Sequence, residues 1–373
     1  MSVQTGLSPA ARLLRDREVA ITHDVDHRTR DRAGVRKQEP IHAEIVIGGL
    51  GHAVGSVVVS NVDLARSLAL PDDWFVRRTG IVERRVCGEG ETVLTLAAQA
   101  VRQACAGADV DVSDLGEETI IIHIQNGLTQ LTPPSGIALV EQLGMDECRV
   151  LAIDGVCAEP IPAVEIATLM LDAGRCDRVI LSAAADFLPI VRHDDTATAG
   201  LFGSGAGAII LSRPEVANAN GSSIIHASSW KTYAAHAGLG RVRVLGHTTN
   251  ENGFTIQAGY YEMDGPGLAR VAVAVLPEVV DDVLNRAGWT KPSVSLVIAH
   301  QPNARLLSIG AQALGLGSSI VPAPVTHLGN MGPASLLVNL ALAGNNGLLT
   351  KGTRVLLVAF GLGFSFGAIA LEI

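Results

Sequence analysis

Short apolar runs bounded by turn residues alternate along the chain with longer segments in which apolar residues recur at helical spacing. The runs predict buried strands at 44–51, 118–124, 149–153, 178–183, 207–211, 223–229, 294–299, 354–363 and 366–373. The helical spacing predicts a short helix that begins near Ser60 and longer helices over 92–105, 134–144, 161–173, 268–287, 303–315 and 333–343. Strands that alternate with helices in this way indicate an α/β protein whose sheets are buried on both faces. We expect loops at 126–134 and 231–265.

The pattern occurs twice. The strand that begins at Arg178 and the glycine-led run 207–211 have counterparts at 354–359 and 367–371. This echo predicts two copies of one α/β unit packed together, with a site that draws residues from both. We therefore expect a flexible or loosely packed N-terminal extension, a first half and a second half, over 1–42, 43–217 and 218–373.

Composition narrows the class of protein. Hydrophobic residues make up 48% of the 373 residues and charged residues 17%, which predicts a large core of Ala, Val, Leu and Ile. The net charge of −9 argues against nucleic acid or an anionic membrane as the main partner. No apolar run approaches the ~18 residues of a membrane span, and no signal peptide is expected. We expect a cytoplasmic protein.

Cysteine and histidine spacing gives no reason to expect a bound metal. The five cysteines are scattered and form no CxxC pair, which favours a reduced protein over a disulfide scaffold or a zinc site. The sequence His23-Asp-Val-Asp-His27 lies in a charge-crowded stretch and is interpreted as solvated surface.

Cys157 stands where a predicted strand, 149–153, turns into a predicted helix, 161–173. The free N–H groups and positive dipole end of a helix favour a thiolate, so this is a suitable place for a nucleophile. The simpler interpretation is one more buried small apolar residue.

Three more candidate positions follow predicted strands. His300 ends the strand 294–299, Asn330 lies in a turn before a helix, and Gly363 lies in a glycine turn after 354–361. Strand ends are where α/β folds gather their active sites. Cys, His and Asn can act together, the first as nucleophile and the others as hydrogen-bond donors to a developing oxyanion. Singly, His300 could be a hydrogen-bonded strand-end histidine and Asn330 a helix N-cap.

Five motifs in this order resemble β-ketoacyl-ACP synthase III of the thiolase superfamily. They are Trp74–Ile81, the turn at Cys157, Phe202–Ala208, His300–Asn303 and Gly329–Ser335, and the resemblance extends from about Ala43 to Ile373. It implies a duplicated, thiolase-like five-layered α-β-α-β-α fold with mixed sheets, usually in a homodimer.

The resemblance also implies the chemistry. Cys157 would take an acyl group as a thioester, and His300 with Asn330 would stabilise the enolate of a malonyl-type extender. The backbone N–H groups of Cys157 and Gly363 would form the oxyanion hole.

The resemblance further implies how substrates enter. Trp74 and Arg78 would lie on the tunnel that admits a pantetheine arm, with Asn303 and Arg305 near its mouth. The protein would need no cofactor of its own, because acyl-CoA or acyl-carrier-protein donors bring coenzyme A or phosphopantetheine.

This sequence departs from the family pattern near the nucleophile. Ala158-Glu159-Pro160 follows Cys157 where the family usually has small residues and then an aromatic one. Glu159 is either a first-turn glutamate that complements the helix dipole or a pocket residue that binds or deprotonates a nucleophilic acceptor.

Two other departures concern substrate binding. Thr196 stands where the family has an arginine that stacks on coenzyme A, with Arg192 as a candidate substitute, and Ser204 replaces an Asp. These differences favour carrier-protein substrates and a specialised polyketide or fatty-acid-type pathway.

The sequence bears on four possible functions. The leading one is a condensing enzyme that forms a carbon–carbon bond by Claisen condensation through acyl-Cys157. The alternative is an acyltransferase that passes the acyl group to a hydroxyl or amine, with His300 as general base. A non-catalytic partner subunit is disfavoured by the intact Cys–His–Asn set. A cysteine peptidase is disfavoured by the duplicated α/β pattern and by the surroundings of Cys157.

Overall fold

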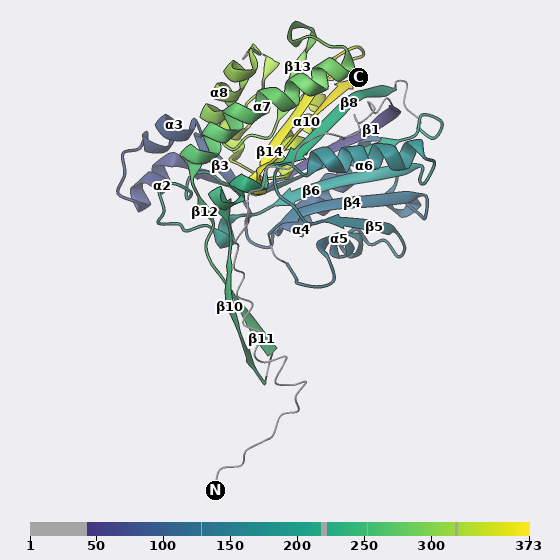
Figure 1. Ribbon diagram of the computed structural model, residues 1–373. Coiled ribbons are helices and arrows are strands. Elements are labelled where there is room, and N and C mark those ends of the chain that lie inside the picture. The colour runs from purple at the N-terminus through teal and green to yellow at the C-terminus, as the bar shows by residue number, and fades with distance from the viewer. Residues whose placement is uncertain (1–42, 128, 218–221, 252, 318–319) are drawn as a thin grey trace, which may run out of the picture. The chain divides into compact units, whose positions relative to one another are not determined.

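The computed structural model describes residues 43–127, 129–217, 222–251, 253–317 and 320–373 (Figure 1). The chain divides into two compact units, Met1–Glu39 and Pro40–Ile373, and the described residues all belong to the second. Both predicted halves lie in this unit. The N-terminal extension and the His23–His27 motif lie outside the described residues.

Within the described residues, the main sheet has nine strands in the order β13-β14-β15-β8-β1-β7-β6-β4-β5. The first half contributes β1 (Ala43–Val54), β4 (Thr119–Asn126), β5 (Arg149–Ile153), β6 (Arg178–Ala185) and β7 (Gly205–Ser212). The second contributes β8 (Ser223–Thr232), β13 (Leu296–Ala299), β14 (Arg354–Gly361) and β15 (Ser365–Glu372). The two sets of strands join where Ala43–Ile45 of β1 pairs with Ser223–Ile225 of β8.

The strand directions confirm that the two halves repeat one arrangement. β4 runs parallel to β5 and β6, and β6 runs antiparallel to β7. In the second half β13 runs parallel to β14, and β14 antiparallel to β15. The strands from each half are therefore mixed, as predicted, and β6–β7 corresponds to β14–β15.

Helices form three layers around these strands (Figure 1). α4 (Val93–Gly107) and α5 (Ser135–Leu143) pack on first-half strands, and α7 (Gly265–Ala287) packs on second-half strands and against α8 (Ala304–Leu314). Two helices, α6 (Pro160–Asp172) and α10 (Ala334–Asn345), contact strands of both halves and so lie between them. Glycine allows this close packing, because a Cβ added at Gly207 of β7 would lie 2.6 Å from Leu337 Cβ. This is the predicted five-layered α-β-α-β-α arrangement.

Helix boundaries follow local signals. Ser60 caps α2 (Asn61–Ser67), and Thr92 with Thr95 forms a capping box at the start of α4. Gly144 and Gly315 end α5 and α8 in the left-handed region. The remaining short elements are β2 (Val57–Ser60), α3 (Trp74–Thr79), β3 (Glu83–Val86) and α9 (Val325–Leu328), with 3₁₀ turns at Val112–Asp114, Leu188–Ile190, Ala234–Leu239, Lys291–Ser293 and Leu362–Phe364.

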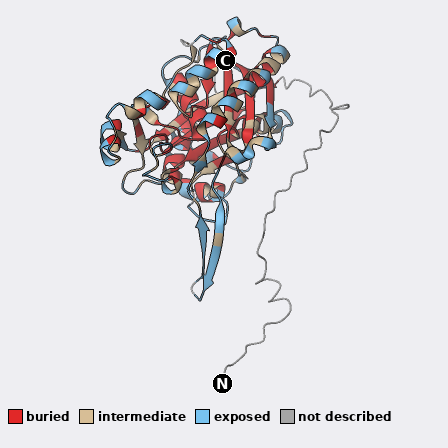
Figure 2. Ribbon diagram, turned by 60° about the vertical axis from the view of Figure 1, so that its left-hand side comes forward, coloured by how far each residue is buried: buried red, intermediate tan, exposed pale blue. Residues whose placement is uncertain are grey.

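The prediction of a loop over 231–265 was wrong. This segment forms β9 (Gly240–Arg241), β10 (Val244–Asn250), β11 (Gly253–Ala258) and β12 (Glu262–Met263). β10 and β11 make an antiparallel hairpin that extends away from the body of the unit, and nearly all of its residues are exposed (Figure 2). Its glycines and its many polar residues hid the strand pattern in the sequence.

A buried histidine makes the fold sensitive to acid. His123 on β4 has no exposed surface, and burial lowers its pKa to about 4, while hydrogen bonds to Gln125 and the Ser182 backbone offset part of this shift. The unfolded chain protonates near the ordinary value of 6.5, so it binds more protons than the folded chain between these two values. Stability is therefore full above pH 6.5 and falls as the pH drops toward 4.

Between pH 6.5 and pH 4, we expect protonation of His123 in the unfolded chain to lower the free energy of unfolding by about 3 kcal/mol. Urea unfolding at a series of pH values would measure it. His123→Gln should make the profile less steep by this amount and leave the slope that the buried His300 contributes, and His193→Gln, at an exposed position, should not change it. An equally steep profile in His123→Gln would contradict the assignment.

Candidate active site

Cys157 lies in the turn between the end of β5 at Ile153 and the start of α6 at Pro160, as predicted, and it is 8% exposed. Two side chains fix the turn. Asn126, the last residue of β4, donates from Nδ2 to the Gly155 carbonyl at 2.8 Å. Glu159 accepts a hydrogen bond from the Val156 N–H at Oε2, at 2.5 Å. Cys157 therefore lies in a turn that two side-chain hydrogen bonds hold in place.

The thiol of Cys157 is neutral at rest. Burial raises its pKa well above the ordinary value, and the negative charge of Glu159 raises the pKa further, while a backbone hydrogen bond opposes both. We had predicted that the helix N-terminus would favour a thiolate. That prediction was wrong because desolvation of the charged form outweighs the dipole at this depth.

The end of β14 brings Cys157 and His300 together. Gly361, the last residue of β14, passes so close that an added Cβ would lie 3.0 Å from the Cys157 amide nitrogen. The His300 N–H donates to the Val358 carbonyl at 2.8 Å, and its ring lies 5.6 Å from the Phe360 ring. Both candidate residues thus contact the last four residues of one strand.

His300 is 3% exposed, and its Nδ1 has no hydrogen-bond partner among the described residues. Burial lowers its pKa to about 3, and a hydrogen bond with the Gly332 backbone offsets part of the shift. The imidazole is therefore neutral at physiological pH, and its single N–H is the one that bonds the Gly332 backbone, so donation to a substrate oxygen would replace that bond. The unpartnered Nδ1 does not fit the simpler interpretation of a fully hydrogen-bonded strand-end histidine.

Asn330 is held by backbone on both sides. Its N–H donates to the Leu201 carbonyl at 2.8 Å, its carbonyl accepts from the Gly203 N–H at 3.0 Å, and its side-chain Oδ1 accepts from the Gly332 N–H at 2.9 Å. Gly332 also meets the His300 ring, so His300 and Asn330 are neighbours. The interpretation of Asn330 as a helix N-cap is wrong, because Pro333 holds that position in α10.

A cavity of about 410 Å³ lies next to this cluster in the chain, although Cys157, His300 and Asn330 do not line it themselves. Its walls include Val156, the residue before Cys157, and Gly363. The segments 126–134 and 231–265, which we predicted as loops, contribute Asn126, Gly127, Gly240, Arg241, Val242 and Tyr261. Burial raises the pKa of the Tyr261 phenol, and the charge that Cys157 carries as a thiolate raises it further, which places Tyr261 close to Cys157.

The sequence placed Gly361 in the candidate turn Gly361–Gly363 without indicating its contact with Cys157, and it did not single out Asn126 or Tyr261. A glycine directly after a buried strand was a signal for Gly361, because such positions often allow close backbone approach. Asn126 and Tyr261 gave no signal in the sequence, since their roles depend on contacts across the fold.

The predicted tunnel residues come from two adjacent helices, α3 and α8. A Cβ added at Gly80, after α3, would lie 2.7 Å from Ala304 Cβ. The Arg78 guanidinium stacks 4.1 Å from the Trp74 ring centre. Asn303 caps α8 through a 2.8 Å bond from the Leu306 N–H to its Oδ1, and Arg305 is exposed in the first turn.

The candidate substitute for the missing family arginine is already paired. Arg192 donates from Nε and Nη2 to the two carboxylate oxygens of Asp194, at 2.9 and 2.7 Å. Ser204 donates to Asp186 Oδ1 at 2.9 Å, which stabilises the start of β7.

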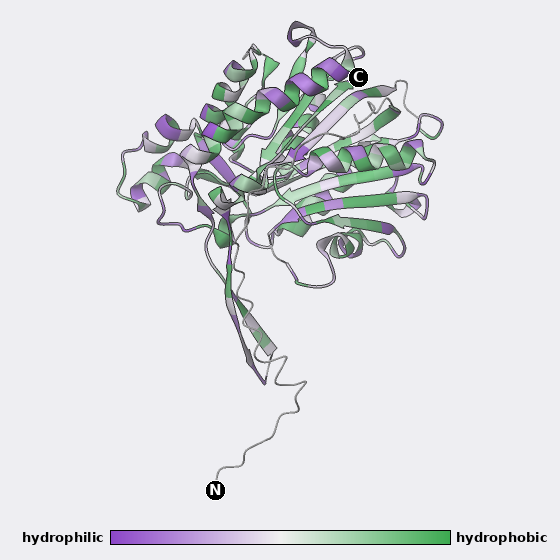
Figure 3. Ribbon diagram, in the orientation of Figure 1, coloured by the Kyte–Doolittle hydropathy of each residue, from purple (hydrophilic) through white to green (hydrophobic). Residues whose placement is uncertain are grey.

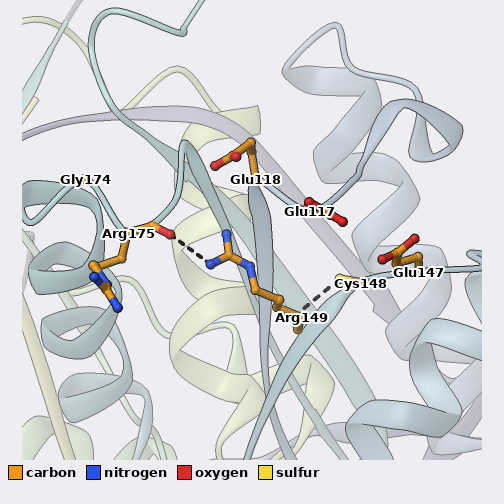
Figure 4. Close-up of a pocket in the computed structure, with 7 residues that line it drawn as sticks. All are labelled: Glu117, Glu118, Glu147, Cys148, Arg149, Gly174 and Arg175. Atoms are coloured by element: carbon orange, nitrogen blue, oxygen red, sulfur yellow. Dashed lines mark hydrogen bonds between the residues drawn. The ribbon is translucent and has the colours of Figure 1, made fainter.

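A second cavity, of about 550 Å³, lies at the other ends of β4 and β5 (Figure 4). Its walls mix acidic and basic side chains from Glu117, Glu118, Glu147, Arg149 and Arg175, with Cys148 and Gly174. Arg149 Nη1 donates to the Arg175 carbonyl at 2.9 Å. Burial raises the pKa of Cys148, and none of His300, Asn330 or Cys157 lines this space.

Replacing Gly361 should slow the enzyme without unfolding it. Its extended backbone, with φ of −153°, suits any residue, so the effect comes from the contact between the added Cβ and the Cys157 and Ala158 amides, both at 3.0 Å. Gly361→Ala should displace the nucleophile by a few tenths of an ångström and lower kcat/KM about tenfold, and Gly361→Val more.

Steady-state kinetics with a thioester substrate would test this. Gly238→Ala, where an added Cβ meets nothing within 4 Å, is the control. Equal rates for the two alanine variants would refute the role of this contact.

Within the described ranges, no group of three or more His, Cys, Asp or Glu side chains could hold a metal ion. None of the helices in these ranges has the length and apolar character needed to cross a bilayer.

The chain is similar in sequence to known proteins. Family models described as 3-oxoacyl-[acyl-carrier-protein] synthase III and its C-terminal part match residues 152–233 and 284–373. A β-ketoacyl-[acyl-carrier-protein] synthase III of Rhizorhabdus wittichii is 33% identical over 327 residues, which cover 88% of this chain and 98% of that protein. One from Neisseria gonorrhoeae is 32% identical over 87% of this chain and 98% of its own length.

Solved structures agree. The 3-oxoacyl-[acyl-carrier-protein] synthase III of Aquifex aeolicus superposes with a TM-score of 0.78 at 29% identity, covering 88% of this chain and 100% of its own. The priming β-ketosynthase of the R1128 polyketide pathway shares the fold, with a TM-score of 0.77 at 23% identity over 91% of this chain and 98% of its own. The chain belongs to the β-ketoacyl-acyl-carrier-protein synthase III family.

Proposed function

We propose that the protein is an acyl-thioester condensing enzyme that forms a carbon–carbon bond through an acyl-Cys157 intermediate. The observation that carries this proposal is that Cys157 and His300 both lie at the end of β14, with Asn330 next to His300 through Gly332, near the cavity that Val156 lines. These are a nucleophile and two hydrogen-bond donors, the set that acyl transfer and enolate stabilisation require.

In the first step the Cys157 sulfur attacks the carbonyl carbon of a donor thioester. The new C–S bond replaces the bond to the donor's sulfur, and the proton of the Cys157 thiol leaves with the departing thiol. No net acid or base is consumed, which suits a thiol whose pKa is raised by burial. We expect the oxyanion that forms on the attacked carbonyl to accept hydrogen bonds from the backbone N–H groups of Cys157 and Gly363.

In the second step a malonyl-type thioester loses its carboxylate as carbon dioxide. The electron pair of the broken carbon–carbon bond moves to the thioester as an enolate. The enolate carbon then attacks the acyl carbonyl, and the Cys157 C–S bond breaks, which leaves a thiolate that regains a proton from solvent.

His300 and Asn330 stabilise the enolate oxygen in this scheme. Asn330 has its Oδ1 engaged by the Gly332 N–H, so its Nδ2 is the end that donates. The low pKa of His300 keeps the ring neutral, so it donates through a single N–H and is a poor general base. A poor base favours condensation over the alternative, acyl transfer to a hydroxyl or amine.

We propose acyl-CoA or acyl-carrier protein as donor, since the stacked Trp74 and Arg78 offer a flat, cationic surface at the expected entrance for a pantetheine arm. The departures at Thr196 and Arg192 favour a carrier protein and a specialised polyketide or fatty-acid-type pathway. A cytoplasmic location suits the five free cysteines.

We also propose a homodimer. β5 forms one edge of the main sheet, and the described chain offers no strand to pair with its outer side. Leu151 on β5 is 38% exposed. An uncovered apolar edge strand is a natural pairing surface for a second copy.

Glu159 is proposed to position the nucleophile and to hold its thiol neutral. Its carboxylate bonds the Val156 N–H and packs over Gly155, and it does not line the cavity. Glu159→Gln keeps an oxygen for that bond but removes the negative charge that raises the pKa of Cys157. We expect the thiolate fraction, and hence the rate of Cys157 alkylation by iodoacetamide at fixed pH, to rise several-fold.

The rate of mass gain by intact-protein mass spectrometry measures this change. Glu141→Gln, at an exposed position on α5, is the matched control. If Glu159→Gln reacts no faster than this control, the charge of Glu159 does not set the state of Cys157.

Intact-protein mass spectrometry also tests the function. The protein is mixed with a panel of acyl-CoA and acyl-carrier thioesters and then with a malonyl-carrier thioester. We expect an acyl mass on Cys157 that the malonyl thioester discharges with release of carbon dioxide and a β-keto product. An acyl mass that only alcohols or amines discharge would establish the acyltransferase, and no acyl mass with any donor would reject both.

A further inference from the structure

The cavity that Val156 and Gly363 line is apolar over most of its wall. Its other apolar side chains come from Phe187, Ile190, Val242 and Leu362. Its polar side chains, among the described residues, come from Asn126, Arg241 and Tyr261. Figure 3 shows the strands of the main sheet mostly in the colours of hydrophobic residues, so a polar group on this wall is an exception that requires a hydrogen-bond partner.

Two of the three polar side chains already have a place to bond. Asn126 donates from Nδ2 to the Gly155 carbonyl at 2.8 Å, and its Oδ1, which lacks a partner among the described residues, is sealed from solvent. The Arg241 side chain is half exposed, and its Nε lies 3.9 Å from a carboxylate oxygen of Glu262. Tyr261 is left as the polar group that a molecule inside the cavity would meet.

The phenol of Tyr261 is fixed in place but unpaired. The backbone N–H of Tyr261 donates to the Ile190 carbonyl at 2.8 Å. Its ring meets the rings of Phe187 and Phe202 edge-on, with ring centres 5.9 and 5.1 Å apart. In the described part of the chain the O–H makes no hydrogen bond, and its oxygen is not sealed from solvent. Partly buried tyrosine hydroxyls usually find a partner, so this one is available to a ligand.

The cavity adjoins Cys157 on two sides. Val156, on its wall, precedes Cys157 in the chain. Gly363, also on its wall, follows Gly361, whose added Cβ would lie 3.0 Å from the Cys157 amide nitrogen. Burial, and after it the charge of a Cys157 thiolate, raise the pKa of the Tyr261 phenol, so the phenol lies close to Cys157 and stays protonated. The first carbons of an acyl group on Cys157 therefore pass this hydroxyl as they enter the cavity.

The free hydroxyl discriminates between acyl chains. A chain that fills the cavity displaces water from the phenol. A purely aliphatic chain would then leave the O–H without an acceptor, which costs free energy. A chain with an oxygen near the thioester would accept the hydrogen bond instead.

We propose that Tyr261 selects acyl donors that carry an oxygen on the third carbon, as 3-oxoacyl and 3-hydroxyacyl thioesters do. The Tyr261 O–H donates to this oxygen, and the apolar wall takes the rest of the chain. The inference rests on the acyl-enzyme of the proposed function and names the class of acyl group that it carries. A 3-oxoacyl thioester is the product of a Claisen condensation, and its reduction gives the 3-hydroxyacyl thioester, so an earlier condensation must supply the donor.

Acylation kinetics with matched donors test the selection. Hexanoyl, 3-oxohexanoyl and 3-hydroxyhexanoyl thioesters on one carrier have the same chain length, and intact-protein mass spectrometry follows the acylation of Cys157. We expect one or both oxygenated donors to acylate the wild-type protein about tenfold faster than the hexanoyl donor. The two oxygenated donors show whether a keto or a hydroxyl oxygen is preferred.

Tyr261→Phe keeps the ring and its edge contacts but removes the hydroxyl. The preference should disappear, because the oxygenated donors lose a hydrogen bond and the hexanoyl donor no longer leaves a hydroxyl unpaired. Tyr260→Phe, whose side chain is 58% exposed, is the matched control and should keep the wild-type preference.

A wild-type protein without a preference, or with one for hexanoyl, would overturn the selection. So would a preference that survives in Tyr261→Phe, or equal slowing of all three donors in that variant, which would assign Tyr261 to the thioester carbonyl or to the fold. Each acyl-enzyme is then treated with a malonyl thioester. If the hexanoyl enzyme forms and is discharged without any selection, the proposed function holds and this inference fails, whereas no acylation by any donor rejects both.

Discussion

Cys157→Ala is expected to abolish the acyl-enzyme and to lower the rate of condensation by at least about 10⁴-fold. The acyl group has no other position from which the enolate carbon could attack it beside the His300–Asn330 pair. Mass spectrometry after mixing with the donor thioester, together with the rate of β-keto product formation, measures both losses. The protein should stay folded, since the sulfur occupies a small volume at the start of α6.

One partial reaction should survive in Cys157→Ala. Decarboxylation of a malonyl thioester needs the enolate donors His300 and Asn330 but no nucleophile. Release of carbon dioxide should therefore continue in the variant without condensation.

Cys176→Ala is the matched control, because that cysteine is also buried, at 1% exposed, and follows the opposite end of α6 from Cys157. A stable acyl adduct on Cys157→Ala, or equal losses in the Cys176 variant, would remove Cys157 from the nucleophile's role.

Much of the fold was predictable because local signals and tertiary packing agree in it. The strands at 118–124 and 178–183 are continuous apolar runs, as strands covered on both faces must be, and helices such as α4 begin at a capping residue. The similarity between the sequence patterns of 178–211 and 354–371 reflects the same antiparallel pair of strands in each half. The hairpin β10–β11 was missed, because its apolar face has no cover within the described chain and its polar face is rich in threonine and glycine.

The sequence indicated the candidate residues of the site but not their electrostatics. Strand ends and motif order pointed to Cys157, His300 and Asn330; the fold brings Cys157 and His300 to the end of β14, and Asn330 lies next to His300 through Gly332. The state of the thiol was predicted wrongly, because a sequence shows the helix that follows Cys157 but not the depth of burial or the orientation of Glu159. For the same reason the contact that Gly361 makes could not be predicted, since it depends on the distance to a backbone amide about 200 residues earlier.

His300→Ala and Asn330→Ala should separate the two half-reactions. Each variant keeps Cys157 and its turn, so formation of the acyl-enzyme should stay within about tenfold of wild type. Each loses one donor to the enolate oxygen, which should lower the condensation rate by about 10²–10³-fold.

The variant that combines His300→Ala with Asn330→Ala tests whether the two residues act together. If His300 and Asn330 donate to the same oxygen, the second substitution should cost much less than the first, because one remaining donor cannot fix the enolate alone. Single-turnover measurement of acyl-Cys157 formation and of its discharge by a malonyl thioester separates the steps, with His193→Ala at an exposed position as control. Losses that multiply would mean that the two residues act at different steps. A loss of acylation as large as that of condensation would assign His300 to the activation of Cys157, for which a ring with a pKa of about 3 is poorly suited.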